Sequence, residues 1–207
     1  MLTKGCKKQS CRHFCCEAIN KAHSLAAFAR EFIQAPSHVG SVCPSSQALT
    51  SAMINYLPDK SKGLIVDLGA GSGIVSEQLV RNGIDASRIV AVEVSPGFKN
   101  IFQKRCPNVS LVVGNARNLS SILDAYDLSA PISGIVSSLP LRMMSASLVT
   151  EIMLEVKNTI EQRGGLLIQY TYAWWMRYSL SKYGFVPVSN QFVLKNLPPA
   201  KVEAYVV

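Results

Sequence analysis

Residues 63–75 read Gly-Leu-Ile-Val-Asp-Leu-Gly-Ala-Gly-Ser-Gly-Ile-Val. The unbroken aliphatic run Leu64–Val66 is typical of a central parallel strand that is buried on both faces. Asp67 ends this run, and three glycines follow at alternate positions before a helical pattern begins. Strand, glycine-rich turn and helix form the first unit of a nucleotide-binding α/β fold, because the glycines let the backbone turn tightly and approach a bound nucleoside.

The spacing of these glycines separates the loop from other nucleotide-binding loops. A dinucleotide fingerprint reads G-x-G-x-x-G, whereas here the third glycine comes one residue earlier, and Asp67 lies two residues before the first. This string resembles motif I of the class I S-adenosylmethionine (SAM) methyltransferases. The resemblance implies that SAM binds over Gly69, Ala70, Gly71 and Gly73, with Asp67 helping to hold the amino group of the cofactor. A NAD site, or a glycine-rich turn without a ligand, is the alternative interpretation.

The composition describes a globular protein with a basic N-terminal segment. The chain has 207 residues, of which 48% are hydrophobic and 16% charged, enough for one domain with a substantial core. No apolar run is long enough to span a membrane and the N-terminus does not read as a secretory signal, so we expect a cytoplasmic protein. The net charge is +8, and residues 1–30 hold six basic residues against one acidic residue. We therefore expect this segment to meet an anionic partner, either a membrane surface or nucleic acid.

We expect the chain to be divided into two parts. Residues 1–35 form a basic segment with an amphipathic helix over about Phe14–Ile33, and residues 36–207 form the α/β domain. The helix either packs on its own domain or lies on anionic lipid. Four cysteines lie within residues 6–16 without a Cys-x-x-Cys pair, so reduced thiols are favoured over a zinc site and no metal is expected.

Polar residues follow the next two predicted strands, at the edge where a nucleoside would bind. Glu93 lies at the end of a strand over Val90–Val94, where a carboxylate can accept both ribose hydroxyls, and Val94 follows it. After the third strand come Asn115 and Ala116, where the methyltransferase family often has Asp-Ala near the adenine amino group. The side-chain oxygen of Asn115 can still accept a hydrogen bond from an amine. These residues are therefore candidates for binding the nucleoside part of a cofactor.

A helix before the glycine loop and the end of the fourth strand complete the candidate site. Ser45 or Ser46 is expected to cap a helix that runs to about Leu57 and forms a candidate lid, and both serines are candidate cofactor contacts. The fourth strand ends in the string Ser137-Ser138-Leu139-Pro140-Leu141, at the position where amino-directed methyltransferases place their catalytic residues. A polar side chain and a backbone carbonyl there can accept hydrogen bonds from a target amine. Leucine at position 141 offers no ring to stack a base, which favours an aliphatic amine over a nucleobase.

Aromatic residues lie at the end of the fifth predicted strand, Leu166–Tyr172. Tyr170 and Tyr172 share a face under the period-2 alternation of a strand, and with Trp174 they are candidates for holding a methylated ammonium group by cation–π contact. Ordinary core packing is the alternative. Two further strands, Phe185–Leu194 and Val202–Val206, read as an antiparallel hairpin. We therefore expect a seven-stranded Rossmann-like sheet of the α/β class, preceded by N-terminal helices.

Five strings, taken in order, resemble the bacterial phospholipid N-methyltransferases, which share the class I SAM fold with rRNA adenine dimethylases. The strings are VGSVCPSS at 39–46, VDLGAGSG at 66–73, SLPL at 138–141, QYTY at 169–172 and NLPPA at 196–200. The resemblance implies transfer of one to three methyl groups from SAM to the amine of phosphatidylethanolamine or a related amino lipid, with phosphatidylcholine as the trimethylated product. It implies an enzyme held peripherally at the inner face of the membrane by its basic N-terminal helix.

The resemblance and the strand positions together give a set of candidate residues. The candidate catalytic residues are Ser137, Ser138, Tyr170 and Tyr172, with Ser137 also near the cofactor; the candidate substrate contacts are Leu139, Pro140, Leu141, Arg142 and Trp174. Arg142 is placed to meet a lipid phosphate. Two other functions stay open, an rRNA or tRNA adenine methyltransferase and a SAM-binding protein without methyltransferase activity. A monomer and a lipid partner are favoured over an oligomer and nucleic acid.

Overall fold

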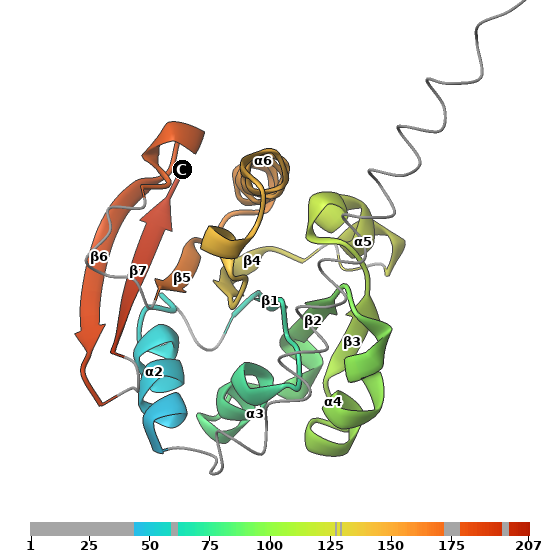
Figure 1. Ribbon diagram of the computed structural model, residues 1–207. Coiled ribbons are helices and arrows are strands. Elements are labelled where there is room, and N and C mark those ends of the chain that lie inside the picture. The colour runs from blue at the N-terminus through green and yellow to red at the C-terminus, as the bar shows by residue number, and fades with distance from the viewer. Residues whose placement is uncertain (1–43, 59–61, 127, 129, 172–178, 196–198) are drawn as a thin grey trace, which may run out of the picture. The chain divides into compact units, whose positions relative to one another are not determined.

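The computed structural model describes residues 44–58, 62–126, 128, 130–171, 179–195 and 199–207 (Figure 1). Within these residues one sheet contains seven strands in the order β3-β2-β1-β4-β5-β7-β6. The strands are β1 Leu64–Leu68, β2 Ile89–Glu93, β3 Ser110–Val113, β4 Ile132–Ser137, β5 Leu167–Thr171, β6 Val186–Val193 and β7 Ala200–Val206. Strands β1 to β5 pair in parallel, and β7 runs antiparallel between β5 and β6. This sheet confirms the predicted class I methyltransferase fold, including its antiparallel C-terminal hairpin.

Helices cover both faces of the sheet. The described α-helices are α2 Pro44–Ile54, α3 Ile74–Arg81, α4 Lys99–Arg105, α5 Leu119–Ala125 and α6 Ala146–Arg163. Figure 1 shows α2, α3 and α4 on one face and α5 and α6 on the other. Alternate residues of β1 follow this division, since Val66 packs in the cluster with α6 and Ile65 in the cluster with α2 and α3. Every residue of β1 and β2 is buried, as expected for parallel strands covered on both sides.

The order of the strands positions the candidate site. The chain runs from β1 outward through β2 to β3 and then returns to β4 on the other side of β1. The carboxyl ends of β1 and β4 are therefore neighbours, with Leu68 paired to Ser137. A doubly wound sheet binds its ligands where the strand order reverses in this way.

The boundaries of the strands and of α2 differ from the predicted ones by up to three residues. The second strand starts and ends one residue earlier than predicted, so that Glu93 is its last residue. Helix α2 starts at Pro44, which corrects the prediction that Ser45 or Ser46 caps it, because both serines lie inside the first turn and proline suits the first helical position. Pro96 begins a 3-10 turn, η2 Pro96–Phe98, which leads directly into α4.

The predicted amphipathic helix of residues 1–35 lies outside the described residues, as do five of the six cysteines. Among the helices that the structure describes, none is long and apolar enough to cross a membrane. The described part of the chain also contains no cluster of three metal-ligating side chains.

Candidate functional site

The glycine loop after β1 packs against the loop after β4. Gly69 has a φ of +80° and Gly71 a φ of +52°, conformations that favour glycine. A β-carbon at Gly69 would lie 2.8 Å from the side chain of Leu139, so the absence of a side chain lets the two loops meet. At Gly71 the nearest atom to such a β-carbon in the described structure is 4.0 Å away. The glycine loop therefore closes on Leu139 at one residue and leaves room for a β-carbon two residues later.

Glu93, the last residue of β2, holds the glycine loop in shape. Its Oε2 accepts a hydrogen bond of 2.9 Å from the Gly71 amide, and its Oε1 accepts one of 2.8 Å from the Ser95 amide. The side chain is mostly buried at this edge of the sheet. Each carboxylate oxygen has two lone pairs, so both can still accept a hydrogen bond from a hydroxyl group.

Asp67 lies inside the protein beneath the same loop. It is fully buried, and its Oδ2 accepts a hydrogen bond of 2.6 Å from the Ser76 hydroxyl on α3. Burial raises the pKa of Asp67 from 3.8 to about 7, against the lowering effect of the hydrogen bonds from Ser76, and the charge of Glu93 raises it further. Its Oδ1 has no hydrogen-bond partner among the described residues. An acceptor of this kind is a candidate for binding a donor on a ligand.

The end of β4 presents backbone and side-chain acceptors beside β1. Ser137 is fully buried, and its hydroxyl accepts a weak 3.4 Å hydrogen bond from the Leu139 amide. The Ser138 amide donates to the Leu68 carbonyl at 2.9 Å, which fixes the segment against β1. The Ser138 Oγ is buried and has no partner in the described structure.

Gln169 on β5 is a residue of this site that sequence reasoning missed. Its Nε2 donates to the Leu139 carbonyl at 3.2 Å and to the Tyr170 carbonyl at 2.8 Å, while its Oε1 is buried without a partner among the described residues. A glutamine directly after the aliphatic run Leu166–Ile168 was the available signal, because a buried polar side chain needs a partner.

Three buried polar atoms without a partner among the described residues come from neighbouring strands, with the Asp67 side chain on the α3 face of the sheet and the Gln169 side chain on the opposite face. Asp67 Oδ1, Ser138 Oγ and Gln169 Oε1 are the buried side-chain oxygen or nitrogen atoms that lack a hydrogen bond in the described structure. Asp67 lies in β1, Ser138 directly follows β4, and Gln169 lies in β5. These three strands are consecutive in the sheet. Because buried polar groups are nearly always paired, each of these atoms is a candidate for binding a donor on a ligand.

The candidate adenine contacts are arranged differently from the prediction. Asn115 Oδ1 accepts a hydrogen bond of 3.0 Å from the Arg117 amide and caps a 3-10 turn, η3 Ala116–Asn118, so this oxygen is turned toward its own chain. Ala116 is buried and Val94 is half-exposed.

Leu141, one of the predicted substrate contacts, is buried in the described structure. It is 5% exposed and packs in the core cluster that includes Val149 and Met153 of α6, because the 3-10 turn η4 Leu141–Met143 directs it inward. Leu139 is partly buried against the same cluster, and Arg142 is exposed.

The predicted aromatic pocket lies only partly within the described residues. Tyr170 is partly buried and packs on the cluster that contains α2 residues such as Met53. Tyr172 and Trp174 lie outside the described residues, as do the side chains of Ser45 and Ser46.

Cys106 is the one cysteine of the described residues, and it supports the glycine loop. Its buried thiol donates to the Gly73 carbonyl at 3.4 Å. Burial raises the pKa of Cys106 to about 11, so the thiol stays protonated at neutral pH. It behaves as a packed, unreactive side chain.

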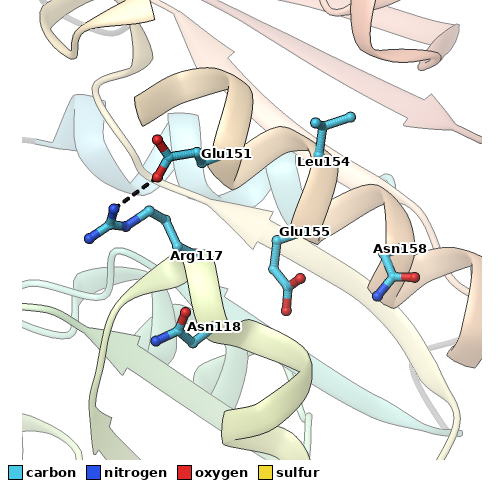
Figure 2. A pocket seen from close by; sticks show the side chains of 6 residues that line it. All are labelled: Arg117, Asn118, Glu151, Leu154, Glu155 and Asn158. Atoms are coloured by element: carbon cyan, nitrogen blue, oxygen red, sulfur yellow. Dashed lines mark hydrogen bonds and ion pairs between the residues drawn. The ribbon is translucent and has the colours of Figure 1, made fainter. Parts of the chain in front are cut away.

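An open groove of about 410 Å³ lies beside η3 and α6, next to the predicted cofactor residues Asn115 and Ala116 (Figure 2). It is lined by Arg117, Asn118, Glu151, Leu154, Glu155 and Asn158. Arg117 is paired with Glu151 at 2.8 Å, as Figure 2 shows, and Glu155 accepts a hydrogen bond from the Ser120 amide at 2.7 Å. The charged side chains that line the groove thus hold α6 against η3 and the start of α5.

Comparison with known proteins gives one family match and two informative relatives. Residues 65–164 match the model of a methyltransferase domain. The chain is 26% identical over 176 residues to the ornithine lipid N-methyltransferase of Singulisphaera acidiphila, covering 84% of this chain and 91% of that protein. It is 30% identical over 82 residues to the ribosomal RNA small subunit methyltransferase A of Thermotoga neapolitana, covering 38% of this chain and 30% of the relative.

Solved structures share the fold at low identity. The 1,6-didemethyltoxoflavin-N1-methyltransferase of Burkholderia thailandensis, with bound S-adenosylhomocysteine, matches with a TM-score of 0.62 at 15% identity and covers 89% of each chain. The magnesium protoporphyrin IX methyltransferase of Synechocystis, with bound SAM, matches with a TM-score of 0.59 at 10% identity, covering 78% of this chain and 79% of that one.

Proposed function

We propose that this chain, a SAM-dependent methyltransferase whose residues 65–164 match the model of a methyltransferase domain, methylates the amine of an amino lipid. The match to the ornithine lipid N-methyltransferase carries the proposal, because it spans 84% of this chain and 91% of the relative. The strings that resemble phospholipid N-methyltransferases favour phosphatidylethanolamine as the substrate. Both lipids carry an aliphatic amine, so the proposal is a lipid-borne primary amine, with phosphatidylethanolamine tested first.

The residues at the carboxyl edge of the sheet fit the cofactor. Glu93 has free lone pairs for the two ribose hydroxyls, and Asp67 Oδ1 has one for the amino group. At Gly71 the loop leaves room for a β-carbon, so a nucleoside can approach its backbone. When bound, SAM supplies an electrophilic methyl carbon whose bond to sulfur breaks as its bond to nitrogen forms, leaving S-adenosylhomocysteine.

The loop after β4 is suited to orient the nucleophile. The amine must be neutral to react, and Leu139 gives the loop an apolar surface that disfavours the charged ammonium form. The Ser138 hydroxyl can accept a hydrogen bond from the amine, which orients the nitrogen lone pair. Holding both reactants in line supplies much of the rate enhancement. The proton that the nitrogen loses after methyl transfer passes to water.

A second candidate function is methylation of adenine in RNA, which the match to the ribosomal RNA methyltransferase favours. That match covers only 30% of the relative. Position 141 provides no aromatic ring, and its leucine packs in the core, so it cannot stack a flipped base. The lipid amine is therefore the better-supported substrate.

The deciding experiment supplies labelled SAM to the full-length protein with three substrates in parallel. These are vesicles containing phosphatidylethanolamine, vesicles containing ornithine lipid, and ribosomal RNA, all at the same ionic strength. Label that migrates with a methylated lipid on chromatography supports the proposal, and identifies the head group. Label found only in RNA overturns it.

We also propose that residues 1–35 hold the protein at an anionic membrane surface, supported by their charge alone. The protein should sediment together with vesicles that contain anionic lipid at low salt, and it should stay in the supernatant at high salt. Replacing Lys4, Lys7 and Lys8 with glutamine should weaken retention, whereas equal retention of both proteins would contradict this role.

A further inference from the structure

The orientation of the Gln169 amide is set by its neighbours. Nε2 lies within hydrogen-bond distance of two carbonyl oxygens, those of Leu139 and Tyr170. Exchanging the nitrogen and oxygen would place an acceptor against two acceptors, so the donor must be on this side. The side chain is only 8% exposed, and its Oε1 therefore remains a buried acceptor without a donor among the described residues.

The sheet brings this acceptor to the end of β4. Ser137 pairs with Gln169 in the parallel register of β4 and β5, and the amide of Gln169 reaches the Leu139 carbonyl. Gln169 thus lies against the Ser138–Leu139 segment, whose Ser138 Oγ is the other unpartnered acceptor there. A ligand that reaches both atoms can satisfy them by offering one donor to each, because an amide oxygen only accepts and a serine hydroxyl can accept.

We propose that Gln169 Oε1 and Ser138 Oγ are a pair of acceptors for the two N–H groups of a neutral primary amine. This inference rests on the proposed function and adds Gln169 to its substrate-binding residues. With both N–H groups held, the nitrogen lone pair points along one direction. Because both acceptors are uncharged, they stabilise the ammonium form less than a carboxylate would, and the reactive neutral amine is kept.

The number of N–H groups on the substrate makes this inference specific. A neutral primary amine has two, a monomethylated amine has one and a dimethylated amine has none. The acceptor pair therefore assists the first methyl transfer most and the third not at all. A residue that only supported the fold would affect all three transfers alike.

The test compares Gln169→Met with the wild-type protein on three lipids that carry a primary, a monomethylated or a dimethylated amine. We expect kcat/KM to fall by about tenfold or more for the primary amine, the effect of losing one buried hydrogen bond, and by less than about twofold for the dimethylated amine. The affinity for S-adenosylhomocysteine, measured by calorimetry, should change by less than about twofold. Gln191→Met, at an exposed position of β6, is the matched control and should leave all values unchanged.

Ser138→Ala removes only the hydroxyl of the second acceptor and should give the same graded loss, so it decides the question if Gln169→Met does not fold. Equal losses on all three lipids, or no loss on any, would overturn the inference while leaving the proposed function intact. Wild-type protein that methylates none of the three lipids would overturn the proposed function, and the inference with it.

Discussion

Replacement of Glu93 tests whether one carboxylate both shapes the glycine loop and binds the cofactor. In Glu93→Ala the amides of Gly71 and Ser95 each lose an acceptor. In Glu93→Gln a single amide oxygen can satisfy only one of them, and the new NH₂ group faces the other. The two variants therefore remove different numbers of contacts at the same place.

The size of the effect follows from these two hydrogen bonds. A hydrogen bond to a charged group contributes about 1.5–3 kcal/mol to stability. The loop lies at the edge of the sheet, where water can reach part of the exposed amides, so we expect Glu93→Ala to lower the free energy of unfolding by roughly 2–4 kcal/mol. For a domain of this size that lowers Tm by roughly 5–15 °C. Because the ribose contacts are lost as well, the affinity for S-adenosylhomocysteine should fall by more than about a hundredfold.

Thermal unfolding and calorimetry with S-adenosylhomocysteine measure the two effects separately. Glu161→Gln is the matched control, because this glutamate is exposed on α6 and is paired only with Lys157 at 3.4 Å. The control should change stability by less than about 0.5 kcal/mol. A Glu93→Ala protein with lowered Tm but unchanged affinity would refute the ribose assignment, and one with unchanged Tm would refute the structural role.

Three further predictions concern the loop, its buried carboxylate and the groove. Gly69→Ala should lower the free energy of unfolding by about 1–3 kcal/mol more than Gly83→Ala in denaturant titrations. Both glycines have positive φ, but only at Gly69 would the new β-carbon lie 2.8 Å from the Leu139 side chain. Equal losses in the two variants would contradict this. The pKa of Asp67 is 3.8 in the unfolded chain and about 7 in the folded protein, so the folded state binds the additional proton between these values. The contribution of Asp67 protonation to the free energy of unfolding is complete below about pH 4. It is lost, by up to roughly 4 kcal/mol, as the pH rises through 7. Asp67→Asn should remove this dependence from urea titrations of the cofactor-free protein, and an unaltered pH profile would show that other groups cause it. Arg117→Ala breaks one exposed ion pair and should lower stability by less than about 0.5 kcal/mol, whereas a loss above about 1.5 kcal/mol would mean that the groove depends on this residue.

Sequence reasoning located the polar residues that follow parallel strands. Asp67, Glu93 and Ser138 were expected at one edge of the sheet, and the structure brings the ends of β1, β2 and β4 together there. This succeeded because buried parallel strands read as continuous aliphatic runs, so the polar residues that end them stand out.

The side-chain partners could not be read in the same way. Asn115 caps its own turn, Leu141 turns into the core, and Gln169 reaches across to the loop after the neighbouring strand. Each outcome depends on which backbone groups the folded chain brings near, and the sequence gives residue types but not these neighbours. The residues whose surroundings sequence reasoning did not predict are those that pack against, or form hydrogen bonds with, the local backbone or another helix or strand.

The contacts of Glu93 with the glycine loop also bear on the entropy of cofactor binding. The amides of Gly71 and Ser95 are already bound by the protein's own carboxylate, so a cofactor meets a loop that is preorganised. Little backbone freedom is then lost on association, and more of the contact energy is retained as affinity. The two amides should accordingly exchange slowly with deuterium even before any ligand is added.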